Sequence, residues 1–413
     1  MAPWERGSRV PHLQEILDLA IRWVHVIAGI MWIGNSLLFN WLDRNLRPSV
    51  RGAPEVYGDI WLLHSGGFYY VEKTSLAGRS LPAPLHWFKW QAYITWLSGA
   101  ALLIVVYYMG GRALLTDPAK AALTPLTAMA VAIGGIVVGW LIYDVVWQYV
   151  APRSRAAAFA VSVLGLVGIV YGLTSVLSGR AAFLHVGALL ATIMAGNVAL
   201  TIMPSQRVLV NAVAQRRPPD PAVAEAAKMR SIHNNYLTFP VIVLMLSNHF
   251  PSVYGHASSW IILLALIAIG AAVRHILNVR ATFRAWAPTL AATLAVGAVL
   301  VFVLTSPSSG SQTADAAAAG AIPAEVTFAD ARSIVDRRCA ACHSATPSIT
   351  DFGPMPGGVS FDEPRQILAL ATRIRVRAIE SRTMPLGNRT RMTDRERALL
   401  GRWLDGLAAG SAR

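Results

Sequence analysis

The chain has 413 residues, of which 54% are hydrophobic and only 14% are charged. This composition is too apolar for an ordinary soluble enzyme and is typical of a protein that spans a lipid bilayer. The formal net charge of +14 does not indicate a nucleic-acid-binding protein, because the basic residues lie between apolar segments and no nucleic-acid-binding motif accompanies them.

Apolar segments dominate the first three quarters of the chain. Residues 1–15 carry charge and proline and lack the short apolar core of a cleavable signal, so we expect a short mature N-terminus. Eight segments long enough to cross a bilayer follow. We predict these spans at 16–42, 87–109, 125–150, 156–177, 182–203, 235–250, 259–279 and 287–305. The predicted fold is an all-α, polytopic transmembrane helical bundle of about eight spans.

Arg and Lys residues between the spans predict the orientation of the chain. The connections 43–86, 151–155, 204–234 and 280–286 hold fourteen of them, and the alternate connections hold three. By the positive-inside rule the first set is cytoplasmic, so both ends of the chain lie outside. We expect a multi-pass protein of the bacterial cytoplasmic membrane, with its N-terminus and its C-terminal domain on the periplasmic side.

Two histidines lie within the outer half of the predicted bundle. Ionisable side chains at bilayer depth are costly, so those present are candidates for function. His25 belongs to the first span and His185 to the fifth. With ordinary tilt the two rings could face each other as ligands of a b-type haem. The alternative is structural, with each histidine hydrogen-bonded to a neighbouring helix.

The connection 43–86 contains a glycine pair followed by aromatic and charged residues. Gly66-Gly67 permits a tight turn. The residues of interest are Tyr69, Tyr70, Glu72 and Lys73, with Trp90 in the next span. The aromatic rings offer flat faces for a planar molecule, and the two charged residues could supply a base and an anion partner. A folded amphipathic lid lying on the membrane is the alternative.

A second polar group lies toward the predicted cytoplasmic side. The sixth span opens with His233, Asn234 and Asn235, and the seventh contributes Arg274 and His275. The sixth span is short and polar at this end, which suggests a water-filled cavity. For Arg274 the alternative is a basic side chain that reaches lipid phosphate from a helix end.

The composition changes after the last span. Residues 306–323 are rich in Ser, Gly and Ala, and we predict a flexible linker between a membrane domain at 1–305 and a soluble domain at 324–413. We expect three helices in the soluble domain. Two capping patterns mark helix starts there, Thr327 with Asp330 and Thr393 with Glu396.

The soluble domain carries Cys339-Ala-Ala-Cys342-His343, the attachment signature of a c-type haem. The two thiols form thioethers to the porphyrin and the imidazole binds the iron. Met384 offers a second axial ligand, and haem iron is the expected metal. The alternatives are a redox dithiol or half a zinc site, but the chain has no other cysteine to complete such a site. The pattern indicates a small class I cytochrome c.

Together these features resemble the membrane-bound urate oxidase (urate hydroxylase) family, in which about eight spans precede a C-terminal cytochrome c. The resemblance rests on the His25 helix, His64-Ser-Gly-Gly-Phe-Tyr, Val71-Glu-Lys73, Trp87-Phe-Lys-Trp90, Ala92-Tyr-Ile-Thr-Trp96, His233-Asn-Asn235 and the haem motif. It implies oxidation of urate to 5-hydroxyisourate, with electrons passing through cytochrome c to a soluble cytochrome c or a terminal oxidase. No hydrogen peroxide would form.

Urate is a flat monoanion, so its site needs a cation, aromatic walls and amide groups. Arg274 or Lys73 would provide the charge. The rings and amides would come from Tyr69, Tyr70, Trp90, Asn234 and Asn235. His233, His275 and Glu72 compete as the base. A cytoplasmic site would require a haem between it and the outer domain, and without one the site would have to lie on the outer side near His185.

Two other functions are compatible with parts of the sequence. A quinol-oxidising membrane electron carrier would need four axial histidines paired on two helices, and the chain does not show that pattern. A ligand-binding transporter or sensor with a cytochrome c tail would use the polar sixth span without chemistry. Anaerobic addition of urate to the purified protein separates these three functions.

Overall fold

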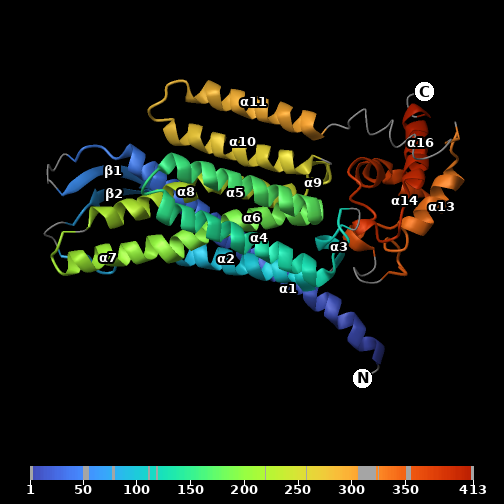
Figure 1. Ribbon diagram of the computed structural model, residues 1–413, viewed down its shortest axis with the longest axis horizontal. Helices are drawn as coiled ribbons and strands as arrows, with labels where there is room; N and C mark the ends of the chain where they lie inside the picture. The colour runs from blue at the N-terminus through green and yellow to red at the C-terminus, as the bar shows by residue number, and fades with distance from the viewer. Residues whose placement is uncertain are drawn as a thin grey trace.

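Long apolar helices run side by side in the computed structural model, and a smaller helical unit lies at one end of them (Figure 1). The structure describes residues 3–49, 55–76, 80–109, 112–117, 120–218, 220–256, 258–305, 322–323, 325–349 and 355–410. The first hydrophobic core belongs to the long helices and the second to the C-terminal unit.

The bundle consists of α-helices, three of which continue into wider π-helical segments (η). Its elements are α1 (Pro3–Asn45), α2 (Trp90–Leu103), η1 (Ile104–Met109), α3 (Arg112–Leu115), α4 (Pro125–Val145), η2 (Val146–Val150), α5 (Arg155–Val176), α6 (Gly179–Gly196), η3 (Asn197–Ile202), α7 (Met203–Ala214), α8 (Pro221–Ser247), α9 (Pro251–Tyr254), α10 (Ser259–Val279) and α11 (Trp286–Thr305). Thr124, Ser154 and Ser178 each cap a helix by accepting a backbone N–H.

Seven stretches of the described chain are long and apolar enough to cross a membrane. They correspond to seven of the eight predicted spans, and they indicate a multi-pass membrane protein. The remaining prediction, 235–250, falls in α8, which is not among the seven. Even so, α8 packs against α6 and α10 inside the bundle. Its buried polar residues, among them Asn234, Asn235 and Thr238, therefore face other helices rather than lipid.

The helices α8 and α10 approach each other closely at Gly270. A Cβ at this position would lie 2.9 Å from the backbone nitrogen of Pro240. Because Pro240 has no N–H to donate and Gly270 has no side chain, the two backbones can come into contact here. The contact fixes the position of Asn235, five residues before Pro240 on α8, relative to Arg274, four residues after Gly270 on α10.

The connection after α1 forms a β-hairpin, so the all-α prediction is wrong for this segment and the fold is mostly helical. Strand β1 (Val56–His64) pairs antiparallel with β2 (Gly67–Thr74). Ser65 and Gly66 turn the chain with φ of 50° and 76°, as two-residue hairpin turns require. The turn was predicted at Gly66-Gly67, and the structure places it one residue earlier, with Gly67 already in β2. The hairpin lies at the opposite end of the bundle from the C-terminal unit (Figure 1).

The C-terminal unit is helical. Its elements are α13 (Phe328–Arg338), η4 (Pro356–Gly358), α14 (Pro364–Ala369), α15 (Ala371–Ile374), η5 (Arg375–Glu380), η6 (Leu386–Asn388) and α16 (Asp394–Gly410). Both predicted capping patterns are confirmed, since Thr327 accepts from Asp330 N and Thr393 accepts from Glu396 N. Helix α13 packs against α16, and Trp403 of α16 lies in the core between them.

Candidate functional site

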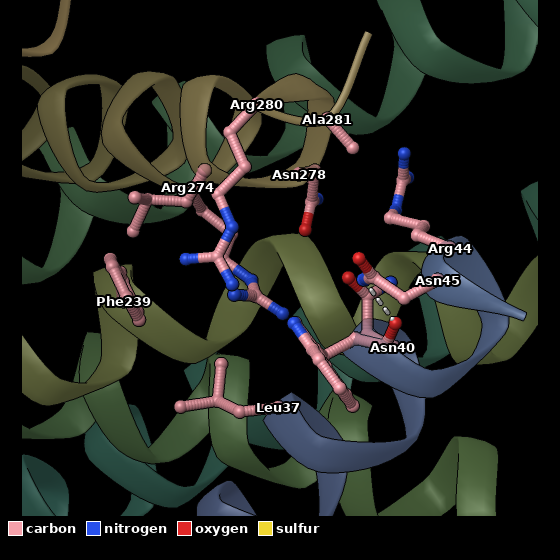
Figure 2. Close-up of a pocket in the computed structure, with 11 residues that line it drawn as sticks. Leu37, Asn40, Arg44, Asn45, Phe239, Arg274, Asn278, Arg280 and Ala281 are labelled. Carbon is pink, nitrogen blue, oxygen red and sulfur yellow. Dashed lines mark hydrogen bonds between the residues drawn. The ribbon is translucent and has the colours of Figure 1, made fainter. Parts of the chain in front are cut away.

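The ends of α1, α8 and α10 enclose a cavity of about 170 Å³ on the hairpin side of the bundle (Figure 2). Its lining residues are Leu37, Asn40, Trp41, Arg44, Asn45, Phe239, Arg274, Leu277, Asn278, Arg280 and Ala281. Four of the α1 residues follow helical spacing, which places them on one face of that helix. Figure 2 shows the Arg274 and Arg280 side chains reaching into the space between α10 and α1.

Three buried polar side chains at this cavity are joined to one another. Asn235 Oδ1 accepts hydrogen bonds from Arg274 Nε at 3.1 Å and from Asn278 Nδ2 at 2.7 Å. The side chains are only 2 to 5% exposed. Within the described part of the chain, Arg274 Nη2, Asn278 Oδ1 and Asn235 Nδ2 have no hydrogen-bond partner. A buried polar atom left unpaired costs about 1–3 kcal/mol, so a ligand or a buried water that bonds to these atoms would be stabilised here.

The lining of the cavity is positively charged. Arg44, Arg274 and Arg280 line it, and none of the described lining residues is Asp or Glu. The ring of Phe239 lies 5.5 Å from the guanidinium carbon of Arg274. Trp41 adds a second aromatic side chain to the lining. The site therefore suits a small anion with flat faces and groups that can both donate and accept hydrogen bonds.

His233 and Asn234 belong to a neighbouring network inside the bundle. Tyr143 Oη lies 2.7 Å from His233 Nδ1, and Asn197 Nδ2 donates to Tyr143 Oη and to Asn234 Oδ1. The ring of Trp147 lies 4.0 Å from the His233 ring. None of these side chains lines the Arg274 cavity. The network joins α4, η3 and α8, and the amide of Asn234 is used in helix packing.

A larger cavity of about 490 Å³ opens beside this network. Asp144 and Glu225 line it together with Arg155 and Arg230. Arg230 Nη2 donates to Asp144 Oδ1 at 3.0 Å. Because its carboxylates oppose a bound anion, this cavity is a weaker anion site than the one at Arg274.

A family model described as Urate oxidase N-terminal matches residues 11–306. The chain belongs to this family. Comparisons with curated proteins and with solved structures gave no match. The matched region contains the whole helical bundle and the Arg274 cavity, and it ends before Cys339. Membership confirms the resemblance predicted for the membrane segments and implies urate as the substrate of the urate oxidase N-terminal domain.

The hairpin residues of the urate oxidase N-terminal domain do not reach the Arg274 cavity. Lys73 Nζ pairs with Asp43 Oδ1 at 2.6 Å, and Tyr70 donates to Asp59 at 2.9 Å. Tyr69 is 53% exposed. Glu72 lies opposite Asp59 in the strand register. The Tyr70 bond thus links the two strands, and the Lys73 pair attaches the hairpin to α1.

Two further predicted site residues of the domain also face away from the cavity. His275 is exposed, and its Nδ1 lies 2.7 Å from the hydroxyl of Tyr236. Trp90 is 62% exposed, with the ammonium of Lys89 5.7 Å from its ring centroid. The structure therefore brings together Arg274 and Asn235 from the predicted set. It adds Arg44, Asn40 and Trp41, which the sequence analysis missed although their spacing on α1 was visible.

His25 and His185 are each hydrogen-bonded to a neighbouring helix in this structure, and a b-type haem between them stays a prediction. His185 is fully buried, its Nδ1–H donates to Ala181 O at 2.7 Å, and its Nε2 lies 2.9 Å from the Tyr108 hydroxyl. Both ring nitrogens of His185 thus have hydrogen-bond partners within the protein. His25 donates to Thr95 O at 3.0 Å between α1 and α2. The structural alternative describes both residues, and we derive no step through a haem b.

The Cys339-Ala-Ala-Cys342-His343 segment follows α13 directly, and its residues fit a c-type haem. The two cysteines are not joined by a disulfide. His343 Nδ1–H donates to Val359 O at 3.3 Å, which leaves Nε2 available for iron, as in metal-bound histidines generally. The Met384 backbone is fixed on both sides, because its N–H donates to Arg377 O and its carbonyl accepts from Arg397.

The two alternatives for the cysteines fit less well. Among the described residues, no group of three or more His, Cys, Asp or Glu side chains could hold a metal ion. A zinc site therefore lacks ligands. Burial raises the pKa of the Cys339 thiol to about 12. A reactive dithiol requires a low thiol pKa, so this environment does not favour redox exchange.

Proposed function

We propose that this protein oxidises urate in the Arg274 cavity and passes the electrons to a c-type haem attached at Cys339 and Cys342. The observation that carries the proposal is the unpaired guanidinium nitrogen of Arg274. It lies in an arginine-lined cavity of a chain that belongs to the urate oxidase N-terminal family. An aromatic anion is the ligand that these residues fit.

The cavity offers urate a complete set of partners. Arg274 Nη2 can donate to a carbonyl or ring nitrogen of the anion. Asn278 Oδ1 can accept a ring N–H, so two of the three buried atoms without partners become paired. Trp41 and Phe239 supply apolar faces for the purine ring. Arg44 and Arg280 raise the local positive potential and favour the monoanion over neutral purines.

The reaction balances without oxygen. Urate and water give 5-hydroxyisourate, two electrons and two protons, and no hydrogen peroxide forms because the electrons leave through the haem. None of the three predicted bases, His233, His275 and Glu72, lines the cavity, so we assign no general base. What the cavity residues do is bind and orient the anion and stabilise negative charge on its ring.

Cys339 and Cys342 would hold the haem through thioethers, and His343 and Met384 would bind its iron. When bound, the group accepts single electrons at a potential raised by the methionine ligand and passes them to a soluble cytochrome c or a terminal oxidase. The cavity and this unit lie toward opposite ends of the bundle. Arg274 is fifteen residues from Ser259, about 22 Å along α10. An intermediate carrier across this distance stays a prediction.

Anaerobic addition of urate to the purified full-length protein tests the proposal. We expect the ultraviolet band of urate to disappear and the bands of reduced c-type haem to appear, with two haems reduced per urate consumed. Reduction by a quinol but not by urate would support the electron carrier instead. Urate binding without haem reduction would support the transporter or sensor, and either result would overturn the proposal.

A further inference from the structure

Two short helices of the bundle contact the C-terminal unit. The short helix α9 packs against η5, and α3 packs against η6 (Figure 1). Sixteen residues, 306–321, separate the end of α11 from Ile322. Fully extended, they would reach about 50 Å, so the connection alone does not determine which edge faces the bundle. The contacts at α9 and α3 do.

The closest contact joins the turn after α9 to the segment before Met384. A Cβ at Gly255 would lie 2.5 Å from Ser381 O and 2.9 Å from Ser381 Cβ. Glycine is therefore required for this approach. Next to it, Arg377 Nη1 donates to the Tyr254 hydroxyl at 3.4 Å. Tyr254 is 6% exposed and Ser381 is 5% exposed, so the contact excludes water from both residues.

The same segment positions Met384. The backbone carbonyl of Arg377 accepts from Met384 N at 2.9 Å, while the Arg377 side chain contacts Tyr254. The hydroxyls of Ser381 and Thr383 lie 3.0 Å apart. Arg397 donates to the carbonyls of Ala378 and Met384. The bundle therefore contacts the segment that positions the predicted axial methionine. Two hydrogen bonds, both made by Arg377, connect the Tyr254 hydroxyl to the backbone of Met384.

The bundle side of this contact is rigid. A side chain at Gly179 would overlap the Tyr254 carbonyl, so the start of α6 holds α9 in place. Ser178 N donates to Leu115 O at 3.0 Å and ties α3 to the same point. Behind Tyr254 lies the ring of Tyr107, which packs 5.5 Å from the His185 ring in the same buried core. The docking surface is therefore supported by packing and hydrogen bonds within the bundle itself.

We infer that this surface, made of Tyr254, Gly255 and α3, is where the C-terminal unit docks to receive electrons. The inference rests on the proposed function. Urate releases two electrons and the haem takes one at a time, so the Met384 edge must receive an electron twice per turnover. The contact is small, but a tethered domain has an effective concentration in the millimolar range, which makes a weak contact sufficient and reversible. While docked, the Met384 edge is covered, so a soluble acceptor must use another face.

Two variants of the full-length holoprotein test the inference from opposite sides of the contact. Gly255→Leu blocks the approach of Ser381, and Arg377→Gln removes the bond to Tyr254 while leaving the backbone bond to Met384. The second variant is needed because a Cβ at Gly255 would also lie 2.7 Å from Pro251 O within α9. Gly406→Leu is the matched control, since a Cβ there meets nothing within 4 Å.

Two readouts are measured, the rate of haem reduction after urate is added and hydrogen exchange in residues 375–388. We expect both variants to slow reduction at least about tenfold and to lose protection in this segment, while haem content and the spectrum after chemical reduction stay unchanged. The inference would be overturned if a variant lost protection in residues 375–388 and its haem were still reduced at the wild-type rate. Retained protection in both variants would also overturn it. Failure of wild type to reduce its haem with urate would instead overturn the proposed function.

Discussion

Replacing Arg274 with Gln removes the buried guanidinium and keeps a side chain that can still donate to Asn235 Oδ1. In the wild-type cavity the guanidinium uses Nε for this bond, and Nη2 has no protein partner among the described residues. The substitution therefore removes the atom that we assign to the ligand. It preserves the contact that holds α10 against α8.

The expected effects on binding and on stability differ in sign. A hydrogen bond to a charged group contributes about 1.5–3 kcal/mol, so urate should bind about 10- to 150-fold more weakly. Without ligand, the unpaired Nη2 costs about 1–3 kcal/mol in the wild type. The Gln variant should then be as stable as the wild type or more stable. A residue that only supports the fold would show the opposite result.

Calorimetric titration of urate in lipid nanodiscs measures the first effect, and the midpoint of thermal unfolding without urate measures the second. Arg284→Gln is the matched control, because Arg284 is exposed after the end of α10 and does not line the cavity. Unchanged urate affinity in the Arg274 variant would refute the reasoning. A large loss of stability with proportionally weaker binding would also refute it, since the residue would then be structural.

Three other predictions concern the remaining parts of the molecule. His343→Ala should abolish electron transfer to an external acceptor and leave urate binding unchanged, and a spectrum identical to wild type would contradict the ligand assignment. Burial alone would raise the pKa of Glu396, but hydrogen bonds from the backbone at its helix start and from Arg338 hold the pKa below its usual range. This stabilisation is present above the unfolded pKa of about 4.3 and is lost as pH falls through the lower folded pKa. Glu396→Gln should therefore destabilise α16 by about 0.5–2 kcal/mol at pH 7. Hydrogen exchange should show no such difference in acid. Gly270→Leu should push α10 from Pro240 and cost about 1–3 kcal/mol, seen as a lower unfolding temperature, and an unchanged temperature would show that α8 and α10 separate easily.

Most spans could be predicted because a bilayer sets both their length and their composition. The predicted segment 259–279 coincides with α10, and 125–150 coincides with α4 and η2. The sixth predicted span was harder to identify, because it contains polar residues. These residues are buried by packing against α6 and α10, which the sequence of the span does not show. Its place in the bundle was predicted, but no hydropathy pattern identifies it.

The hairpin was missed although its sequence contains the signal. Two runs of nine and eight residues, rich in aromatic and β-branched side chains, flank Ser65-Gly66. We interpreted the aromatic run after the glycines as a surface for a ring-shaped ligand. In the structure Tyr70 instead packs against Trp61 across the strands, with ring centroids 5.0 Å apart. Cross-strand pairing explains these residues without a ligand.

The cavity was only half predictable, because its two sides come from helices more than two hundred residues apart. Arg274 and Asn235 were identified because polar groups within spans are rare. Arg44 and Asn40 lie near a predicted cytoplasmic helix end, where basic and polar residues are common and need no further function. One sequence does not show that the end of α1 faces α10, so their role became visible only from the structure.

The burial of Arg274 distinguishes between two roles for this residue, anion binding and lipid anchoring. A lipid anchor keeps its charged group at the surface, whereas Arg274 is 5% exposed and is held by Asn235 inside the bundle. Arg44 and Arg280 stand close enough to act on it, and like charges repel strongly away from water. The described lining residues contain no carboxylate, so a bound anion would reduce this repulsion. The fold thus keeps an energetic cost at this point that an aromatic anion removes on binding, and raising the urate concentration should increase the unfolding temperature of wild type more than that of Arg274→Gln.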